Sequence, residues 1–160
     1  MRLSIAAVGR LKAGPEKLLA ENYYARAGAL GRKIGISRIA VTEFAESQAS
    51  SPASRMAEEG KLLAGAVPPK AFTAVLDERG KAISSEAFAA LLQRHLDQGT
   101  PEVCFLIGGP DGHAPETRGR AGLLLSLGPM TWPHRLARVM LFEQLYRAVT
   151  IMVKHPYHRQ

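Results

Sequence analysis

The chain has 160 residues, of which 46% are hydrophobic and 22% are charged, and its formal net charge is +7. This length and composition predict one globular domain, residues 1–160, with a substantial buried core, and no apolar run is long enough to span a membrane. The single cysteine, Cys104, excludes an intrachain disulfide and fits a reducing compartment, so we expect a cytoplasmic protein.

The positive charge is concentrated at the two ends of the chain. Residues 1–35 contain seven Lys or Arg residues against two acidic ones, and residues 130–160 contain five against Glu143 alone. The segment between them is slightly acidic. Basic ends suit a phosphate-rich partner such as a nucleic acid, and a solvated basic surface without a partner is the alternative.

The first third of the chain predicts a strand, a helix and a second strand. The run Arg2–Gly9 is apolar on both faces, which is typical of a strand covered by helices on each side and not of a secretory signal. Pro15 suits the first turn of a helix that we expect to reach about Leu30. A strand is predicted over Ile34–Phe44, followed by a mobile, Ser-rich loop over Ala45–Ala53.

The middle of the chain continues this alternation. A helix is predicted over Pro52–Gly65, and its charged residues are expected to face outward: Glu58, Glu59 and Lys61. A short buried strand, Phe72–Leu76, should end in a turn over Asp77–Lys81 with Gly80 at its tip. Ser84 is the expected N-cap of the next helix, which Gly99 ends.

The following segment repeats the same order of elements. We expect a strand, a glycine turn, a short helix and a further strand over Val103–Ile107, Gly108–Gly112, Glu116–Gly122 and Leu123–Leu127. Strands that alternate with helices in this way predict an α/β fold with a mainly parallel sheet.

The last predicted helix, from about Pro133 to Lys154, is apolar almost all the way round. Its polar stripe is narrow and consists of Glu143, Arg147, Thr150 and Lys154, of which the first two are spaced to pair. A helix with so little polar surface must bury two faces, one on the sheet and one elsewhere. The second face predicts either a symmetric homodimer or a helix buried within a monomer.

The turn Gly108–Gly112 follows a buried strand, at the place where open α/β sheets bind ligands. Glycines there allow close approach of the backbone to a ligand. No Gly-Lys-Ser/Thr follows and the spacing is not GxGxxG, which disfavours a nucleotide phosphate site. A tight strand-to-helix connection without a ligand is the alternative.

Two further loops are expected at the same edge of the sheet, after Leu76 and over Gly128–Pro133. Three converging loops make a small-molecule pocket plausible, with apolar walls from Leu76, Ile107, Met130 and Trp132; core packing is the alternative for the last two. No metal site is predicted, since the histidines are too few and Cys104 has no partner cysteine.

Several stretches together resemble the RlmH family, the ribosomal large subunit pseudouridine methyltransferases of the SPOUT class. The resemblance covers essentially the whole chain. The stretches that carry it are Leu76-Asp77, Gly80-Lys81, Ser84–Glu86, Phe105–Gly112, Thr131–His134, Glu143–Arg147 and His155–Arg159.

The resemblance implies a SPOUT-like parallel α/β sheet with a C-terminal trefoil knot, working as a homodimer. It implies S-adenosylmethionine as cofactor, bound in a pocket formed by Leu76, Gly109, Gly128, Pro129, Met130, Thr131, Trp132 and Pro133. The implied substrate is a pseudouridine of helix 69 in 23S ribosomal RNA, methylated at N3 in the assembled ribosome. No metal and no membrane are involved.

Methyl transfer depends mainly on positioning, and N3 must lose a proton, so a base is useful. We expect His158 in this role, with Tyr157 and Arg159 orienting the nucleotide, supplied by the tail of the other subunit. Candidate contacts to RNA phosphates are Arg2, Arg10, Lys12, Lys17, Arg26, Arg135, Arg138 and Lys154. The rival hypotheses are a non-catalytic RNA- or ribosome-binding module and a nucleotide-binding enzyme that uses the glycine turn for phosphate.

Overall fold

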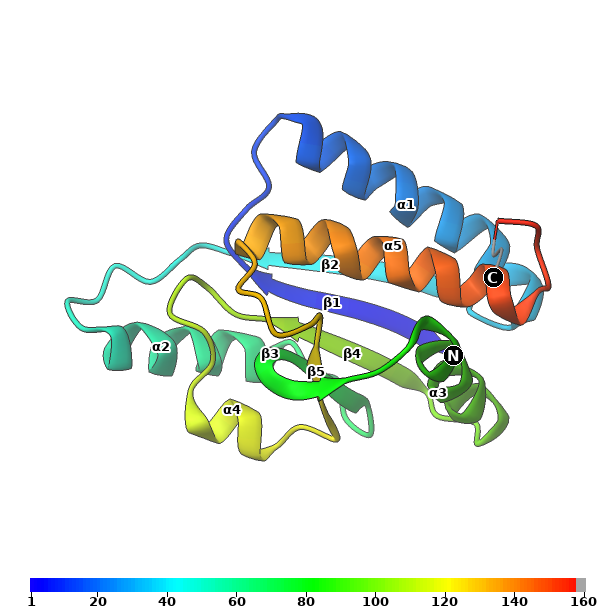
Figure 1. Ribbon diagram of the computed structural model, residues 1–160. Helices are drawn as coiled ribbons and strands as arrows, with labels where there is room; N and C mark the ends of the chain where they lie inside the picture. Colours follow the sequence, from blue (N-terminus) through cyan, green and yellow to red (C-terminus); the bar gives the residue numbers. More distant parts are fainter. Residues whose placement is uncertain (158–160) are drawn as a thin grey trace.

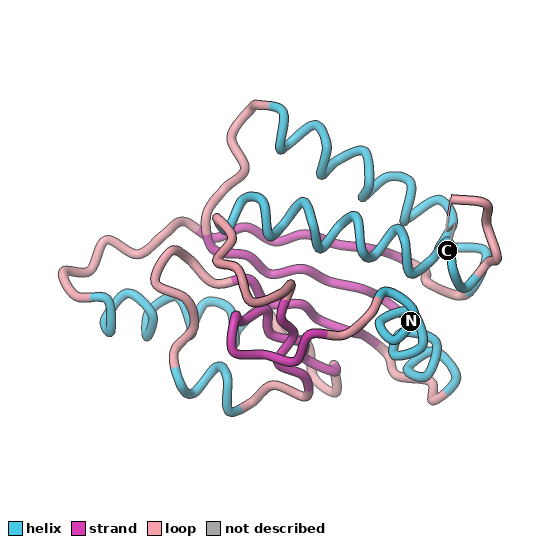
Figure 2. Tube along the Cα trace, viewed as in Figure 1, coloured by secondary structure: helices cyan, strands magenta, loops and turns pink. Residues whose placement is uncertain are grey.

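The computed structural model describes residues 1–157 as a five-stranded, wholly parallel sheet flanked by helices (Figure 1). The sheet order is β2-β1-β4-β3-β5. Figure 2 shows that the loops after β1, β2 and β5 all leave the sheet at the same end. The predicted α/β class is therefore confirmed. The strands are β1 (Arg2–Val8), β2 (Arg38–Phe44), β3 (Phe72–Ala82), β4 (Glu102–Ile107) and β5 (Leu123–Ser126).

The central strands are buried on both faces because each face has its own core. In β4, Phe105 and Ile107 point into the larger core, whereas Cys104 and Leu106 point into the smaller one. All six residues of β4 are buried, which explains the uninterrupted apolar run of the five that follow Glu102. Cys104 is a small buried hydrophobic residue, as predicted, and burial raises the pKa of its thiol.

Three helices cover the larger core and two lie on the opposite face of the sheet (Figure 1). Their starts follow the expected capping chemistry: the Ser84 hydroxyl accepts a hydrogen bond from the Ala87 backbone N–H at 3.1 Å, and Ser51 caps the preceding helix in the same way. The larger core carries α1 (Pro15–Gly31), α3 (Ser85–Asp97) and α5 (His134–Met152), and the other face carries α2 (Pro52–Gly65) and α4 (Pro115–Gly119). None of the helices described over residues 1–157 is long and apolar enough to cross a membrane.

Two strand boundaries differ from the prediction by four residues or more. β2 begins at Arg38 rather than Ile34, because a short 3₁₀ helix, η1 (Arg32–Ile34), precedes it and Gly35 turns the chain with a φ of +90°. β3 does not end at Leu76 but continues to Ala82, and the expected free turn is part of the strand.

The helix α5 lies on the sheet with α1 and α3 packed against it, so most of its apolar surface is buried within one chain. Thr150, predicted to lie on the polar stripe, is fully buried, and its hydroxyl donates a hydrogen bond to the Arg147 carbonyl at 2.6 Å. Leu136 remains 40% exposed near the start of the helix. The interpretation of α5 as a central helix therefore accounts for most of its composition without a partner.

The Ser-rich loop before α2 has no helix or strand, as predicted, but hydrogen bonds hold it against that helix. The Ser47 backbone N–H donates to Glu59 Oε1 at 3.0 Å. Glu59 was expected to face outward, yet it is only 2% exposed. The prediction was wrong because the loop folds back over this face of α2, which the helical pattern alone does not reveal.

Candidate functional site

The bulged part of β3 after Leu76 and the loops after β4 and β5 line a cavity of about 250 Å³ at the carboxyl edge of the sheet. The sequence predicted that these three segments converge, although the first of them lies within a strand and not in a free turn. The apolar part of the lining includes Leu76, Ile107, Leu125 and Leu127. A mainly apolar cavity with a few polar groups is typical of a small-molecule site.

Six of the eight predicted cofactor residues line this cavity. They are Leu76, Gly109, Gly128, Met130, Thr131 and Trp132. Pro129 and Pro133 belong to the same loop but are not among the lining residues. Met130 is 67% exposed and Trp132 is 39% exposed, so neither is a core residue. Their roles in binding a cofactor stay predictions.

The glycine turn is tightly packed against the rest of the protein. A Cβ atom on Gly108 would lie 2.8 Å from the Gly112 carbonyl oxygen, and one on Gly109 would lie 2.7 Å from Glu59 Oε2. Gly112 has a φ of +83°, and its N–H donates to the Gly109 carbonyl at 3.0 Å. Glycine is therefore needed here for internal packing and backbone conformation, and its role in access to a ligand stays a prediction.

His113, directly after the turn, is a polar residue of the cavity that the sequence reading missed. It is 3% exposed, and neither ring nitrogen has a hydrogen-bond partner of standard geometry among the described residues. Burial lowers the pKa of His113, an effect that the charge of Asp77 opposes. Arg118 bridges the two segments, because it donates to the His113 carbonyl at 2.7 Å and pairs with Asp77 at 3.5 Å.

The loop after β5 is shaped by its first residues. Gly128 has a φ of +111°, which disfavours other residues, and Ser126 accepts a hydrogen bond from the Gly128 N–H at 3.2 Å. At the end of the loop His134 faces the cavity, with its Nε2 3.6 Å from Glu46 Oε1. Burial lowers the pKa of His134, which favours its neutral form.

Arg138 was predicted to contact RNA phosphates, and this prediction is wrong. The side chain is fully buried, pairs with Glu43, and donates to the Gly9 carbonyl at 2.6 Å. Glu43 also accepts a hydrogen bond from the Leu11 N–H at 3.0 Å. Arg138 thus joins α5 to the loops that follow β1 and β2. Its charge suggested a surface role, but the large apolar fraction of α5 leaves this position inside.

Other basic candidates remain available at the same edge of the sheet. Arg10 and Lys12 lie exposed in the loop after β1, and Arg135 lies exposed in the first turn of α5. The two segments are adjacent, since a Cβ on Gly9 would lie 2.9 Å from His134 Nε2. We call Arg10, Lys12 and Arg135 the basic rim. Arg2, by contrast, pairs with Glu102 at 2.9 Å near the amino edge.

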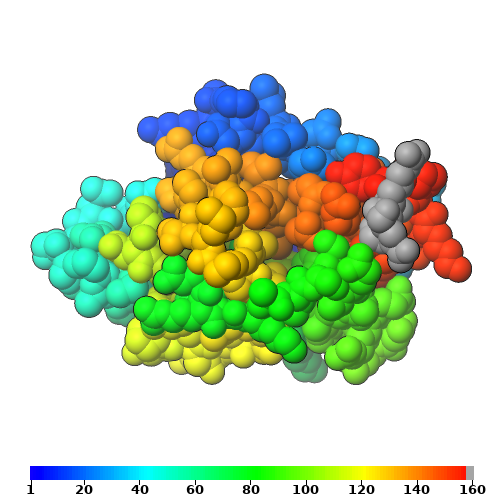
Figure 3. All heavy atoms as spheres, in the orientation of Figure 1, coloured from blue at the N-terminus to red at the C-terminus, as the bar shows by residue number. Residues whose placement is uncertain are grey.

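Figures 1 and 3 show the start of α5 (orange) and the segment that follows it (red) at opposite ends of the helix. Tyr157, a predicted catalytic residue, belongs to the following segment, whereas the cavity is lined by residues at and before the start of α5. A helix of 19 residues spans roughly 28 Å at about 1.5 Å per residue. The Tyr157 hydroxyl donates to Glu143 Oε1 at 3.2 Å, and Arg147 pairs with the same carboxylate at 2.6 Å. Burial, with a hydrogen bond to Tyr23, raises the pKa of Tyr157 to about 12.

Aromatic and cationic groups surround this residue. The ring of Tyr146 lies 4.6 Å from that of Tyr157, and the Arg26 guanidinium lies 4.2 Å above the Tyr146 ring. His158 and Arg159 lie outside the described residues, so their predicted roles stay predictions. Residues 1–157 contain no group of three or more His, Cys, Asp or Glu side chains that could hold a metal ion.

Comparison with known proteins extends these observations. A family model described as predicted SPOUT methyltransferase matches residues 1–158. The chain is 52% identical over 159 residues to ribosomal RNA large subunit methyltransferase H of Rhodopseudomonas palustris strain HaA2, and 48% identical to the protein of that name from Brucella anthropi. Each alignment covers 99% of both chains.

The fold is also shared with a solved structure. "A probable methylase family protein from Haemophilus influenzae Rd KW20" superposes with a TM-score of 0.52 at 11% identity, over 99% of this chain and 70% of that chain. At this identity the likeness concerns the fold alone. It agrees with the α/β sheet and the helical layers described above.

Proposed function

The chain belongs to the SPOUT methyltransferase family, and from this premise we propose that it methylates large subunit ribosomal RNA with S-adenosylmethionine as methyl donor. The observation that carries the proposal is the convergence of the bulged part of β3 and the loops after β4 and β5 on one cavity at the carboxyl edge of the sheet. The relatives that match the chain over 99% of its length are named for this activity. Since ribosomes are the substrate, we place the protein in the cytoplasm.

The residues of the cavity fit such a donor. Leu76, Ile107 and Leu125 offer an apolar wall for a flat purine ring, and the backbone of the glycine turn offers donors and acceptors for its edge. Glu78 adds negative charge to the lining, which suits a cationic sulfonium. When bound, S-adenosylmethionine supplies the methyl group, and the protein contributes position, orientation and exclusion of water.

We place a trefoil knot at the same loops. Leu76 and Lys81 of β3 both pair with Leu125 of β5, and the residues between them bulge out of the ladder. The chain is in tight contact there, because a Cβ on Gly80 would lie 2.7 Å from the carbonyl carbon of Leu124. These contacts support a path in which β5 lies within the loop of β3.

The substrate atom is N3 of a pseudouridine in helix 69 of 23S ribosomal RNA, in the assembled ribosome. The names of the relatives specify large subunit ribosomal RNA. The particular nucleotide and atom come from the resemblance of the sequence to the family. The basic rim beside the cavity supports it, since three exposed cations favour binding of a phosphate backbone. His158 accepts the N3 proton, while Tyr157 and Arg159 orient the nucleotide.

The working unit is a homodimer in which the tail of one subunit completes the cavity of the other. Tyr157 and the cavity lie at opposite ends of α5 in one chain, so the tail of the same subunit starts far from the donor. Leu136, Met130 and Trp132 offer exposed apolar surface beside the cavity for subunit contact. Light scattering coupled to gel filtration should give twice the chain mass of 17.3 kDa.

The central experiment is calorimetric titration of the protein with S-adenosylmethionine. We expect saturable binding, and no heat at millimolar donor would contradict the proposal and favour a non-catalytic RNA-binding module. Mass spectrometry of 23S RNA fragments, before and after incubation of ribosomes with the enzyme, then identifies the nucleotide. Methylation of any base other than the helix 69 pseudouridine would overturn the substrate assignment.

A further inference from the structure

A bidentate ion pair between Arg55 of α2 and Asp111 attaches the glycine turn to this helix. Arg55 Nε lies 2.6 Å from Asp111 Oδ2, and Arg55 Nη2 lies 3.1 Å from Asp111 Oδ1. The third nitrogen, Nη1, donates to the Ala49 carbonyl at 3.1 Å. One guanidinium therefore holds the turn and the loop before α2 at once. The pairing lowers the pKa of Asp111 and keeps it ionised.

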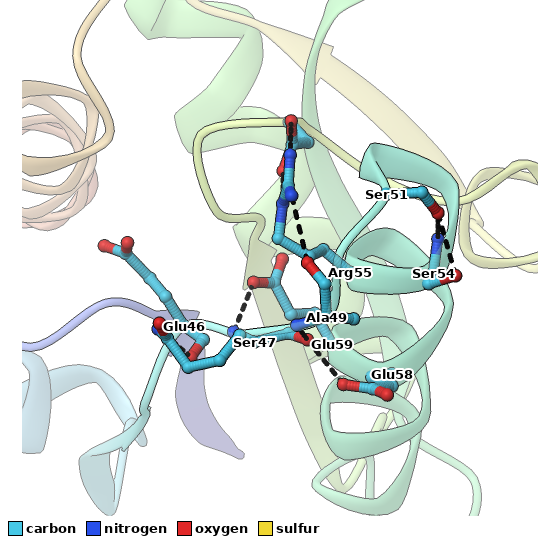
Figure 4. A network of polar contacts seen from close by, with 10 residues as sticks. Glu46, Ser47, Ala49, Ser51, Ser54, Arg55, Glu58 and Glu59 are labelled. Carbon is cyan, nitrogen blue, oxygen red and sulfur yellow. Dashed lines mark hydrogen bonds and ion pairs between the residues drawn. The ribbon is translucent and has the colours of Figure 1, made fainter.

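A second contact lies one helical turn further along α2. Figure 4 shows Arg55 and Glu59 on the same side of the helix, with Glu59 reaching Ser47 of the preceding loop. The carboxylate of Glu59 lies directly beneath Gly109, where no Cβ would fit. Residues spaced by four share a helix face, so α2 presents both groups to the turn.

The turn itself is a closed unit. Gly109 and Gly112 form a bridge, and the Cα of Gly108 is too close to Gly112 for any side chain. Its internal shape therefore needs no help from α2. The position of the turn relative to β3 and β5 does depend on α2. The ion pair with Arg55 joins the turn to this helix, which the buried Leu63 anchors separately.

We propose that Arg55 is a positioning residue of the methyl-donor site. Through Asp111 it sets the distance between the backbone of the turn Gly108–Gly112 and the ligand in the cavity. The proposal rests on the proposed function, since it assumes that the cavity holds the donor. The energy of a contact between the backbone and a ligand falls steeply with distance, and a misplacement of about 1 Å lowers the rate of a reaction by up to roughly 100-fold.

A purely structural role would show itself differently. The side chains of Arg55 and Asp111 are 28% and 24% exposed, and a partly solvated ion pair adds little to global stability. The helix α2 has its own N-cap at Ser51 and its own core residue at Leu63. Loss of Arg55 should therefore change the Kd for the ligand much more than the unfolding temperature.

The test measures S-adenosylmethionine affinity by calorimetry in Arg55→Ala, Asp111→Asn and the double variant. We expect the Kd to rise about tenfold in each single variant and no further in the double variant, because both changes break one connection. The KM for the donor should rise while kcat at saturating donor stays within about threefold. Arg55→Lys keeps the positive charge but cannot make the two parallel hydrogen bonds to Asp111, so its Kd should lie between those of the wild type and Arg55→Ala.

The matched control is Arg2→Ala, which breaks another ion pair of this chain, to Glu102, far from the cavity. It should leave the Kd for the donor unchanged. An unaltered Kd in Arg55→Ala, or additive effects in the double variant, would overturn the proposal.

A measurement without donor separates this proposal from the proposed function. Amide hydrogen exchange of residues 108–114 should be faster in Arg55→Ala than in the wild type, with α3 unchanged. A wild type that binds no donor but shows this difference would contradict only the function. Unchanged exchange in the turn would contradict the positioning role, whatever the ligand.

Discussion

The two ends of α5 use arginine in opposite ways. At the start of the helix Arg138 is fully buried and its hydrogen bonds go to Glu43 and to backbone carbonyls. At the other end Arg147 stays partly exposed among Glu143 and Tyr157. The buried arginine joins α5 to the loops that follow β1 and β2, whereas the partly exposed one lies beside the Glu143 carboxylate and the Tyr157 ring.

Within one chain this division separates the cavity that we propose for the donor from the polar cluster around Tyr157. The proposed reaction needs both, and they lie at different positions along α5. The comparison therefore supports a site assembled from two subunits.

Removal of Tyr157–Gln160 should abolish methylation of ribosomes and leave donor binding intact, because the cavity lies at the other end of α5. Methylation is measured by transfer of radioactive methyl groups and binding by calorimetry. Mixing the truncated protein with a Gly108→Val variant should restore activity, since each mixed dimer then has one intact tail and one intact cavity. Normal activity of the truncated protein would rule out a catalytic tail.

Arg138→Ala should lower the free energy of unfolding by about 3 kcal/mol, the lower end of the typical cost of breaking a buried ion pair, because the Glu43 side chain is 31% exposed. The substitution removes the guanidinium from the Glu43 carboxylate and from the Gly9 carbonyl, while Glu43 keeps its hydrogen bond from the Leu11 N–H. Urea denaturation gives the value. The neighbouring exposed Arg135→Ala is the control and should change stability by no more than about 0.5 kcal/mol. An Arg138→Ala protein as stable as the control would mean that the buried pair is replaceable by solvent.

Replacement of the basic rim, Arg10, Lys12 and Arg135, by alanine should weaken binding to a helix 69 RNA fragment. Each lost phosphate contact should reduce the slope of log K against log salt by about one. Fluorescence anisotropy at several salt concentrations measures this slope. Arg94→Ala, an exposed change on α3, is the control. An unchanged salt slope would remove the rim from the RNA interface.

The smallest effect concerns pH. The folded-state pKa of His113 is lowered, so the neutral imidazole stabilises the fold fully above the unfolded value of about 6.5. This contribution is lost as the pH falls from about 6.5 toward the lower folded-state pKa. His113→Gln should therefore flatten the fall in unfolding free energy as the pH drops below about 6.5. Parallel curves for the two proteins would show that His113 does not contribute.

Much of the fold follows from local patterns in the sequence. The apolar runs of β1 and β4, the caps at Ser51 and Ser84 and the glycine turn are each dictated by residues within a few positions. The order of strands and helices then predicts a parallel sheet, and a parallel sheet brings its carboxyl-end loops to one edge. For this reason the convergence of the three cavity segments was predictable, although the first of them lies within β3 and not in the free turn that was predicted after Leu76.

Which charged side chains are buried and which are exposed to solvent depends on the tertiary structure. Glu59 and Arg138 are charged residues of a type that usually lies on the surface. The loop before α2 covers Glu59, and the loops after β1 and β2 cover Arg138. The pairing of Arg55 with Asp111 spans 56 positions. Local pattern cannot report such contacts, because the free energy of a buried charge depends on partners supplied by distant segments.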